Sequence, residues 1–306
     1  MAVNDPVYVN ESGLPLNAIE WLEIHHRSKM PERAQMIRDI RFKLGSTVVD
    51  AGCGPGLWTP LLARAIGYQG HILGVDMSPE ALTTAYRRMH GKRYARMVQY
   101  KHGLLEQLPV PFGSVDSIFS ANVSQYLPDP VATFAAMGSY IAPGGRLVIK
   151  DIDFGTMQFH NIDAGLQARV FRARECWEQQ RVAAGYAFED SWVGSKLASY
   201  LRAAGYEEVQ EKSYRIVRQF PLSQDFRYYL QGIAEWFVCE GAPLLNQEDL
   251  IHWLQCFADG EQSAFDKNSF VSEETEYVVT GIWNRSYSTS VRYIDMYIKT
   301  PEVALV

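Results

Sequence analysis

The sequence has little of what marks nucleic-acid-binding or membrane-spanning proteins. Its 306 residues carry 29 Lys and Arg against 35 Asp and Glu, a formal net charge of −6, and no basic stripe is visible. Both features argue against a nucleic-acid partner. No uninterrupted apolar run is long enough to span a bilayer, and the first residues lack the basic and apolar regions of a signal peptide. We therefore expect no membrane partner.

Cysteine is scarce and widely spaced. The four cysteines, which form no Cys-x-x-Cys pair, are Cys53, Cys176, Cys239 and Cys256. This spacing argues against a zinc site, and we expect no bound metal. It also argues against a disulfide framework and fits a reducing, cytoplasmic environment.

The first half of the chain alternates strands with helices. Two helices are expected first, over Ala18–Lys29 and from Pro31 to about Phe42. Five apolar strands that alternate with further helices are then expected over Val48–Asp50, His71–Asp76, residues 97–102, Val115–Ser120 and Arg146–Asp151. This alternation is typical of a doubly wound α/β fold with a parallel sheet.

The second half is richer in helices and aromatic residues. Two helices are expected over residues 163–204, and a helical insertion follows over about 221–265. Strands over Val209–Phe220 and Glu276–Trp283 would bring the sheet to seven strands, mostly parallel. The polar tail, residues 285–306, holds a segment that could form an edge strand or a contact in a homodimer.

No linker or repeat divides the chain, so we expect one domain over residues 1–306. Its expected parts are an N-terminal helical segment (1–44), a cofactor-binding core (45–155) and two helical insertions (156–204 and 221–270). The insertions are expected to form a lid over the substrate.

The most informative stretch is the glycine-rich loop after the first strand, Asp50-Ala51-Gly52-Cys53-Gly54-Pro55-Gly56. Without a Cβ, glycine lets a ligand lie against the main chain. The second strand ends in Asp76, and neighbouring parallel strands present such acids at the ligand-binding edge of the sheet. The dinucleotide fingerprint is excluded because its third glycine falls on Leu57 or Thr59, and no Walker A lysine follows.

These segments resemble the class I S-adenosylmethionine-dependent methyltransferases. Val49–Gly56 resembles motif I of that family, Gly74–Ser78 resembles motif II, and Pro143-Gly144-Gly145 resembles the turn before strand five. The resemblance is close over residues 35–155 and looser beyond them. It implies a Rossmann-like fold, methyl transfer as the reaction, S-adenosyl-L-methionine as cofactor and S-adenosyl-L-homocysteine as its product.

The resemblance also implies cofactor-binding roles for the residues of the two motifs. Asp76 would accept both ribose hydroxyls with its two carboxylate oxygens. Asp50 would lie near the ammonium of the cofactor, or it would only cap the turn. The full set expected from these motifs is Asp50, Gly52, Cys53, Gly54, Gly56, Asp76 and Met77.

The third loop departs from the family pattern. The family often has an acid there for the adenine amino group, but Gly103 is followed by Leu104 and Leu105. We expect the adenine to meet a backbone N–H and an apolar wall from these leucines, with Glu106 as an alternative partner. Asn122, after strand four, is expected to bond either the cofactor or only its own loop.

The substrate is expected to be a small molecule. Nucleic-acid amino methyltransferases carry Asn/Asp-Pro-Pro-Tyr after strand four, whereas this chain has Asn122-Val123-Ser124-Gln125-Tyr126. The aromatic residues of the insertions would line a pocket for an apolar or aromatic compound, or they would only form the core. The substrate-contacting candidates are Tyr229, Trp236 and Phe237, with Tyr8 from the N-terminal segment.

A general base is needed only where the nucleophile must lose a proton. His160, after strand five, is the first choice, and His25 and Tyr126 are further candidates. His25 and His26 are adjacent, and because neighbouring residues do not share a helix face, at most one of them is expected to point inward.

The sequence thus predicts a methyltransferase that acts on an oxygen, nitrogen or carbon nucleophile of a small apolar or aromatic metabolite, as in natural-product biosynthesis. Two alternatives remain open. The same fold and cofactor could serve a non-methylating reaction such as a cyclisation, or the chain could be a non-catalytic binding module.

Overall fold

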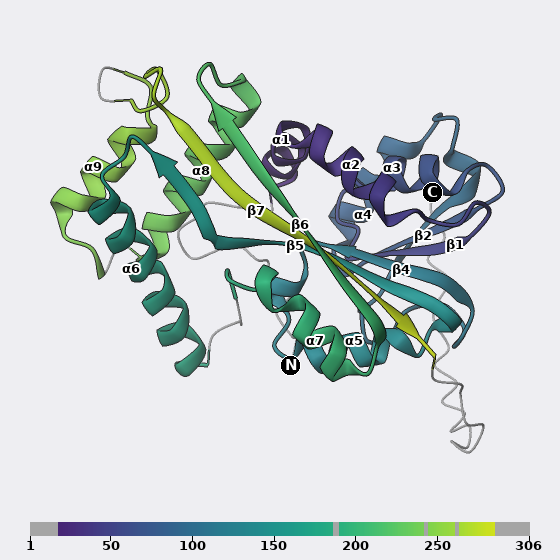
Figure 1. The fold of residues 1–306 in the computed structure, drawn as a ribbon. Coiled ribbons are helices and arrows are strands. Elements are labelled where there is room, and N and C mark those ends of the chain that lie inside the picture. Colours follow the sequence, from purple (N-terminus) through teal and green to yellow (C-terminus); the bar gives the residue numbers. More distant parts are fainter. Residues whose placement is uncertain (1–17, 186–189, 242–243, 261–262, 285–306) are drawn as a thin grey trace.

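A seven-stranded sheet with helices on both faces dominates the computed structural model (Figure 1), which describes residues 18–185, 190–241, 244–260 and 263–284. The strands are β1 (Thr47–Ala51), β2 (His71–Asp76), β3 (Val98–His102), β4 (Val115–Ala121), β5 (Ile141–His160), β6 (Glu207–Gln219) and β7 (Val271–Trp283). Their order is β3-β2-β1-β4-β5-β7-β6. All neighbours pair in parallel except β7, which is antiparallel to β5 and β6. The predicted mostly parallel, doubly wound sheet of seven strands is confirmed.

Several helices begin at local signals that the sequence displays. The α-helices of the described residues are α1 (Ile19–Ser28), α2 (Met30–Ile40), α3 (Thr59–Ile66), α4 (Pro79–Met89), α5 (Pro130–Gly138), α6 (Ala164–Ala183), α7 (Leu197–Ala204), α8 (Gln224–Gly241) and α9 (Gln247–Phe257). Ser78 caps α4 by accepting from Ala81 N at 3.2 Å, and Asp129 caps α5 by accepting from Ala132 N at 2.9 Å. A proline follows each cap, where its missing N–H costs no hydrogen bond.

Alternate residues of the central strands face two hydrophobic cores. Val49 and Ile149 belong to a core covered by α5 and α7, whereas Val48 and Val148 belong to a core covered by α2 and α3. Because side chains alternate along a strand, these cores lie on opposite faces of the sheet. The region predicted as the first lid insertion therefore includes α7, a helix that covers the sheet.

β5 and β7 are longer than the sequence predicts. The predicted strand five ends at Asp151, but β5 continues to His160, and β7 begins at Val271 instead of Glu276. The two strands pair antiparallel as far as His160 and Val271, with an irregularity between Asp153 and Gln158. These backbone hydrogen bonds join segments that are distant in the sequence, so no local pattern marks the extra residues.

The extended ends of β5 and β7 carry α6, α8 and α9, which gather at one end of the molecule (Figure 1). We call these three helices the helical lobe. A third hydrophobic core lies within it. Phe154 packs on Trp236 with ring centroids 4.8 Å apart, and Phe171 stacks on Phe237 at 4.4 Å. The parts of the two predicted insertions that form α6, α8 and α9 thus make up a lobe with an aromatic core.

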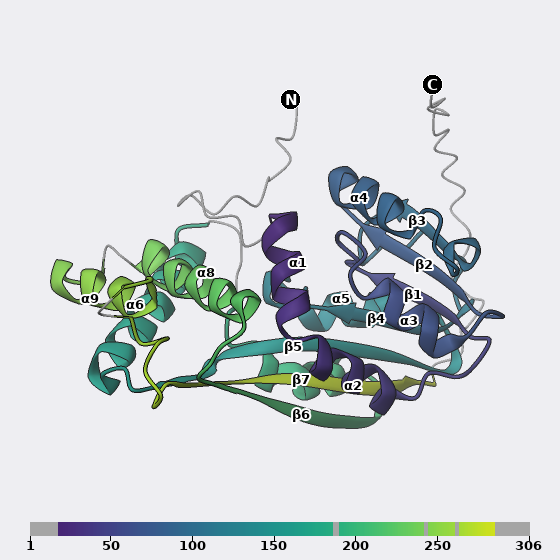
Figure 2. The ribbon, with the colours of Figure 1, turned by 90° about the horizontal axis from the view of Figure 1, so that it is seen from above.

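α1 lies between the helical lobe and the first strands of the sheet (Figure 2). On one side, Arg27 donates two hydrogen bonds of 3.0 Å to Asp225 of α8. On the other side, Glu23 pairs with Arg88 of α4, and Arg88 Nε donates to Pro55 O in the glycine-rich loop at 2.9 Å. α1 therefore joins the lobe to the edge of the sheet where ligands are expected.

Candidate cofactor and active site

The glycine-rich loop after β1 is bonded to the end of β2. Gly52 N and Cys53 N both donate to Val75 O, at 2.8 and 3.0 Å. The Cys53 side chain is buried beneath the loop. Asp50 and Asp76, the acids near the ends of β1 and β2, are thereby brought to the same edge of the sheet.

Gly52, Gly54 and Gly56 have φ angles of 71°, 51° and 72°, and they have different structural roles. A Cβ on Gly52 would meet Val123 Cγ2 at 2.5 Å, and one on Gly56 would meet Ala85 Cβ at 2.9 Å, so packing requires both glycines. A Cβ on Gly54 would meet no atom within 4 Å. Of the three, Gly54 is the one whose bare backbone faces open space, where a ligand can lie against it.

Asp76 holds the loop and keeps capacity for a ligand. Its Oδ2 accepts from Gly54 N at 2.7 Å, and its Oδ1 accepts from Ser78 N at 2.9 Å. Burial raises the pKa of Asp76, against these backbone hydrogen bonds. Each carboxylate oxygen has a further lone pair, so both can still accept from a diol such as a ribose.

Asp50 is buried more deeply, with 2% of its surface exposed. Its Oδ2 accepts from Thr59 Oγ1 at 2.8 Å, which ties the end of β1 to the start of α3. Burial raises the pKa of Asp50 to about 7. The bond from Thr59 gives Asp50 a structural role at the start of α3, and a cation beside Asp50 would favour its ionised form.

Arg33 of α2 is a candidate site residue that the sequence did not suggest. It is 1% exposed, its Nη1 donates to His26 Nδ1 at 2.6 Å, and its guanidinium carbon lies 5.1 Å from the Trp58 ring centroid. Its Nε and Nη2 have no partner among the described residues. Trp58 closely follows Gly56, so the Arg33 guanidinium packs on a residue that follows the glycine-rich loop. Its two unpartnered N–H groups are of the kind that binds a carboxylate with two parallel hydrogen bonds.

Asn122 marks the carboxyl end of β4. Its φ is 59°, an unusual value for a residue with a side chain, and its backbone N donates to Lys150 O at 2.8 Å. Lys150 Nζ donates to Asn122 Oδ1 at 2.6 Å. The next residue, Val123, packs against Gly52, so Asn122 lies beside the cofactor loop.

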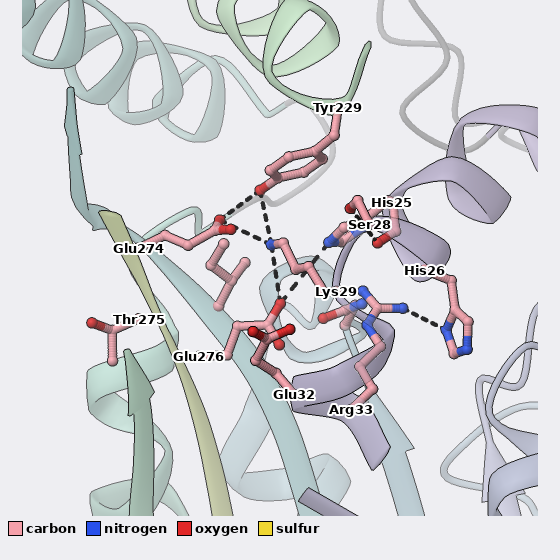
Figure 3. A network of polar contacts seen from close by, with 12 residues as sticks. His25, His26, Ser28, Lys29, Glu32, Arg33, Tyr229, Glu274, Thr275 and Glu276 are labelled. Atoms are coloured by element: carbon pink, nitrogen blue, oxygen red, sulfur yellow. Dashed lines mark hydrogen bonds and ion pairs between the residues drawn. The ribbon is translucent and has the colours of Figure 1, made fainter. Parts of the chain in front are cut away.

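A buried network of charges joins Lys29, between α1 and α2, to Glu274 and Glu276 of β7 and to Tyr229 of α8 (Figure 3). Lys150 Nζ lies 2.9 Å from Glu276 Oε1, and Lys29 Nζ lies 3.1 Å from the same oxygen. Lys29 also lies 2.9 Å from Glu274 Oε2 and donates to Tyr229 Oη at 2.9 Å. Burial lowers the pKa of Lys150 to about 8, with Glu276 opposing. Burial alone would raise the pKa of Glu276, but Lys150, Lys29 and Arg33 hold it well below its usual range.

Both histidines of α1 are buried, so the expectation that at most one points inward is wrong. His25 stacks on Tyr229 with centroids 4.9 Å apart, and His26 meets Trp58 edge-on at 5.6 Å. Each finds a buried side because α1 lies between α8 and the start of α3. Burial and nearby cations lower the pKa of His25 well below its usual value and that of His26 to about 2.

The other predicted base candidates lie in different places. Tyr126 is half-buried in a 3₁₀ turn (Ser124–Tyr126) that follows Asn122, close to the carboxyl end of β4. Lys150 pairs with Ala121, the last residue of β4. His160 ends β5 about 23 Å further along the sheet, because Val278 and Val271, the β7 partners of Lys150 and His160, are seven residues apart at about 3.3 Å per residue. It is exposed there and lies 3.2 Å from Glu273 Oε1. The structure does not bring His160 to the cofactor loops.

Residues of the remaining loops lie at the rim. Met77 and Leu104 are 43% and 46% exposed, and Leu105 packs partly on the core. Glu106 Oε1 accepts from Thr133 Oγ1 at 2.7 Å. Glu106 is therefore engaged with α5, while Leu104 offers an apolar surface.

The three aromatic substrate candidates of the insertion are all buried. Tyr229 and Phe237 are 0% exposed and Trp236 is 1% exposed. Trp236 and Phe237 pack in the lobe core, as in the alternative reading of these aromatics, whereas Tyr229 faces the charged network. Tyr8 lies outside the described residues.

Two further surveys cover only the parts of the chain that the structure describes. No helix there is both long and apolar enough to cross a membrane. No group of three or more His, Cys, Asp or Glu side chains there is arranged to hold a metal ion.

Comparison with known proteins gives consistent matches. A family described as "Methyltransferase domain" matches residues 42–218. The ubiquinone biosynthesis O-methyltransferase of Xylella fastidiosa is 36% identical over 166 residues, which cover 53% of this chain and 61% of that protein. The arsenite methyltransferase of Halobacterium salinarum is 36% identical over 108 residues, covering 35% of this chain and 27% of that protein.

A solved structure supports the fold. The YcgJ protein of Bacillus subtilis superimposes with a TM-score of 0.52 at 17% identity, covering 86% of this chain and 100% of that one. The first curated relatives are matched only in part, over 27% to 61% of their length.

Proposed function

Because the chain belongs to the methyltransferase-domain family, we propose that it transfers a methyl group from S-adenosyl-L-methionine to a small molecule. The observation that carries this proposal is the set of unmet hydrogen-bonding groups around one loop. Gly54 leaves its backbone open, Asp76 keeps free lone pairs, and Arg33 keeps two N–H groups without a partner.

These groups fit the cofactor in kind and in order. Asp76 would accept the ribose hydroxyls, and Leu104 with Leu105 would border the adenine. Arg33 would bind the carboxylate of the amino-acid part, with Asp50 near its ammonium. When bound, the cofactor supplies an electrophilic methyl group on a positively charged sulfur. The chain has to hold the acceptor in line with that methyl group and exclude water.

We place the acceptor between α1 and the carboxyl end of β4. Asn122 and Tyr126 lie there, and Tyr229 with His25 closes the side toward α8. Lys29, Arg33 and Lys150 oppose a positive charge on His25, so we do not assign it the role of general base. The acceptor is then one that needs little help to lose its proton, or that loses it to solvent.

The relatives narrow the acceptor class. A ubiquinone biosynthesis O-methyltransferase and a demethylmenaquinone methyltransferase are both similar to this chain. We therefore propose a small aromatic compound with oxygen substituents as the acceptor. A role in secondary metabolism, a cytoplasmic location and a homodimer belong to the same proposal, and the dimer is checked by light scattering of the purified protein.

Two measurements test the function. Isothermal titration with S-adenosyl-L-homocysteine should show one binding site per chain, and absence of binding overturns the proposal. Incubation with S-adenosyl-L-methionine and a panel of hydroxylated aromatic compounds should give a product heavier by one methylene unit. A product of unchanged mass would instead support a non-methylating reaction, and tight binding without any turnover would support a binding module.

A further inference from the structure

The side-chain amide of Asn122 has a fixed polarity. Its neighbour Lys150 is 0% exposed, and its Nζ donates to the amide at 2.6 Å. A lysine ammonium has only donors, so the amide oxygen must face Lys150. The Nδ2 group of Asn122 must then point the other way.

That Nδ2 group is available to a ligand. It makes no hydrogen bond among the described residues and is not among their buried unsatisfied atoms. Asn122 directly follows β4 and lies beside the glycine-rich loop, because the next residue, Val123, packs on Gly52. The backbone is held as well, through the 2.8 Å bond from Asn122 N to Lys150 O. The two N–H groups of Asn122 Nδ2 therefore point in a fixed direction from the edge of the sheet.

Lys150 cannot easily release the amide. Its ammonium is held on the far side by Glu276 at 2.9 Å, and Glu276 is in turn bound to Lys29. The other charged group beside this loop is Asp151, whose Oδ2 accepts from Ser124 N at 2.9 Å and whose Oδ1 accepts from Ile152 N at 3.0 Å. Neither the Glu276 carboxylate nor the Asp151 carboxylate bonds the Asn122 amide, so neither favours a rotated amide in which Nδ2 would face Lys150.

We propose that Asn122 determines the acceptor class by donating to a carbonyl or hydroxyl oxygen of the acceptor, and that Lys150 is the positioning residue that fixes its polarity. The inference rests on the proposed function and deepens it. The fixed N–H groups of Asn122 stabilise a bound compound whose oxygen accepts a hydrogen bond from them. In an amino compound of the same shape, N–H groups would face the N–H groups of Asn122. Asn122 therefore selects oxygen-substituted aromatic compounds over their amino counterparts.

The test compares 1,2-dihydroxybenzene with 1,2-diaminobenzene, two compounds of nearly the same shape. Their dissociation constants are measured by calorimetry on the full chain saturated with S-adenosyl-L-homocysteine, so that no turnover is involved. The wild-type protein should bind the dihydroxy compound about tenfold more tightly, the value of roughly one hydrogen bond.

Asn122→Asp provides the decisive variant because it keeps the bond to Lys150 and replaces Nδ2 by an acceptor. It should abolish the preference, because the hydroxyl groups and the amino groups can both donate to the carboxylate. Lys150→Gln should lose most of the discrimination because the amide can then turn over. If Lys150→Gln fails to fold, Asn122→Asp alone decides. Asn161 provides a matched control, since it also has a positive φ, 74°, but follows His160 far from the site, so Asn161→Asp should leave the preference unchanged.

The outcomes separate the two proposals. Equal affinities in the wild type, no binding of either compound to protein that binds S-adenosyl-L-homocysteine, or an unchanged preference in Asn122→Asp overturns the inference about Asn122. Failure to bind S-adenosyl-L-homocysteine overturns the proposed function itself.

Discussion

Arg33 offers the sharpest test of the cofactor site. Its guanidinium is 1% exposed, yet Nε and Nη2 lack partners. Leaving a buried donor unsatisfied costs about 1–3 kcal/mol, so the empty protein gains little from this edge of the side chain. The same two donors, aimed at a carboxylate, would give two charge-assisted hydrogen bonds, each worth about 1.5–3 kcal/mol.

Arg33→Met should therefore separate affinity from stability. The affinity for S-adenosyl-L-homocysteine should fall by about 100-fold or more, which corresponds to about 3 kcal/mol. The free energy of unfolding should change by less, because the lost donation to His26 is offset by removal of two unsatisfied groups. Calorimetric titration gives the first quantity and urea denaturation gives the second.

A second ligand isolates the contact. 5′-Methylthioadenosine lacks the amino-acid carboxylate, so its affinity should be the same for the wild type and for Arg33→Met. Arg174→Met is the matched control, because Arg174 is also 0% exposed but pairs with Glu178 in the helical lobe. That variant should lose about 3–5 kcal/mol of stability and keep its cofactor affinity. The reasoning fails if Arg33→Met binds S-adenosyl-L-homocysteine within about threefold of the wild type.

Three further predictions concern the glycine-rich loop and two buried titratable groups. Gly54→Ala and Gly113→Ala should each cost about 1 kcal/mol of stability because both positions have positive φ and open space around the added Cβ. Only Gly54→Ala should lose affinity for S-adenosyl-L-homocysteine. Equal affinity in both variants would contradict the proposed approach of the ligand to Gly54. Burial raises the pKa of Asp50 to about 7. The affinity for S-adenosyl-L-homocysteine should therefore rise about tenfold between about pH 6 and pH 8, as the carboxylate forms beside the ligand ammonium. A parallel titration of Asp50→Asn should not show this tenfold rise. Burial lowers the pKa of His26 to about 2, so below about pH 6.5 the unfolded chain takes up a proton there that the folded chain does not. This residue should therefore lower the free energy of unfolding by about 1.4 kcal/mol per pH unit as the pH falls. Urea denaturation of His26→Gln should show a pH dependence of the free energy of unfolding that is smaller by one proton, and an unchanged pH dependence would refute the assignment.

Local signals in the sequence were enough for the cofactor half of the sheet. β2 spans His71–Asp76 as predicted, and Ser78 caps α4 as predicted. Each of these signals involves residues close in the chain: a buried run, a glycine turn, a cap followed by proline. The length of β5 could not be predicted in this way, because the residues that extend it to His160 are fixed by pairing with β7.

The buried charges were missed for a different reason. Arg33 shares the inward stripe of α2 with Met36, Ile37 and Ile40, and Glu274 and Glu276 alternate with half-buried residues along β7. Their positions follow the helical and strand periods, and only their residue types do not. A charge at an inward position is costly unless it is paired or used. The expected last strand began at Glu276 and so left Glu274 outside it, and Arg33 was not considered as an inward residue of its helix. Treating these positions as buried charges would have pointed to the network.

The buried network of charges connects the glycine-rich loop side of the molecule with β7. Lys29 and Arg33 are joined by a helical hydrogen bond of 3.0 Å from Arg33 N to Lys29 O. Lys29 is held by Glu274 and Glu276 of β7, while the Arg33 guanidinium packs on Trp58, which closely follows the glycine-rich loop. The start of α2 therefore fixes the cofactor side and the acceptor side with one turn of helix. Since β7 also holds Lys150, and through it Asn122, the C-terminal strand orients the groups proposed to bind the methyl donor and those proposed to choose its acceptor.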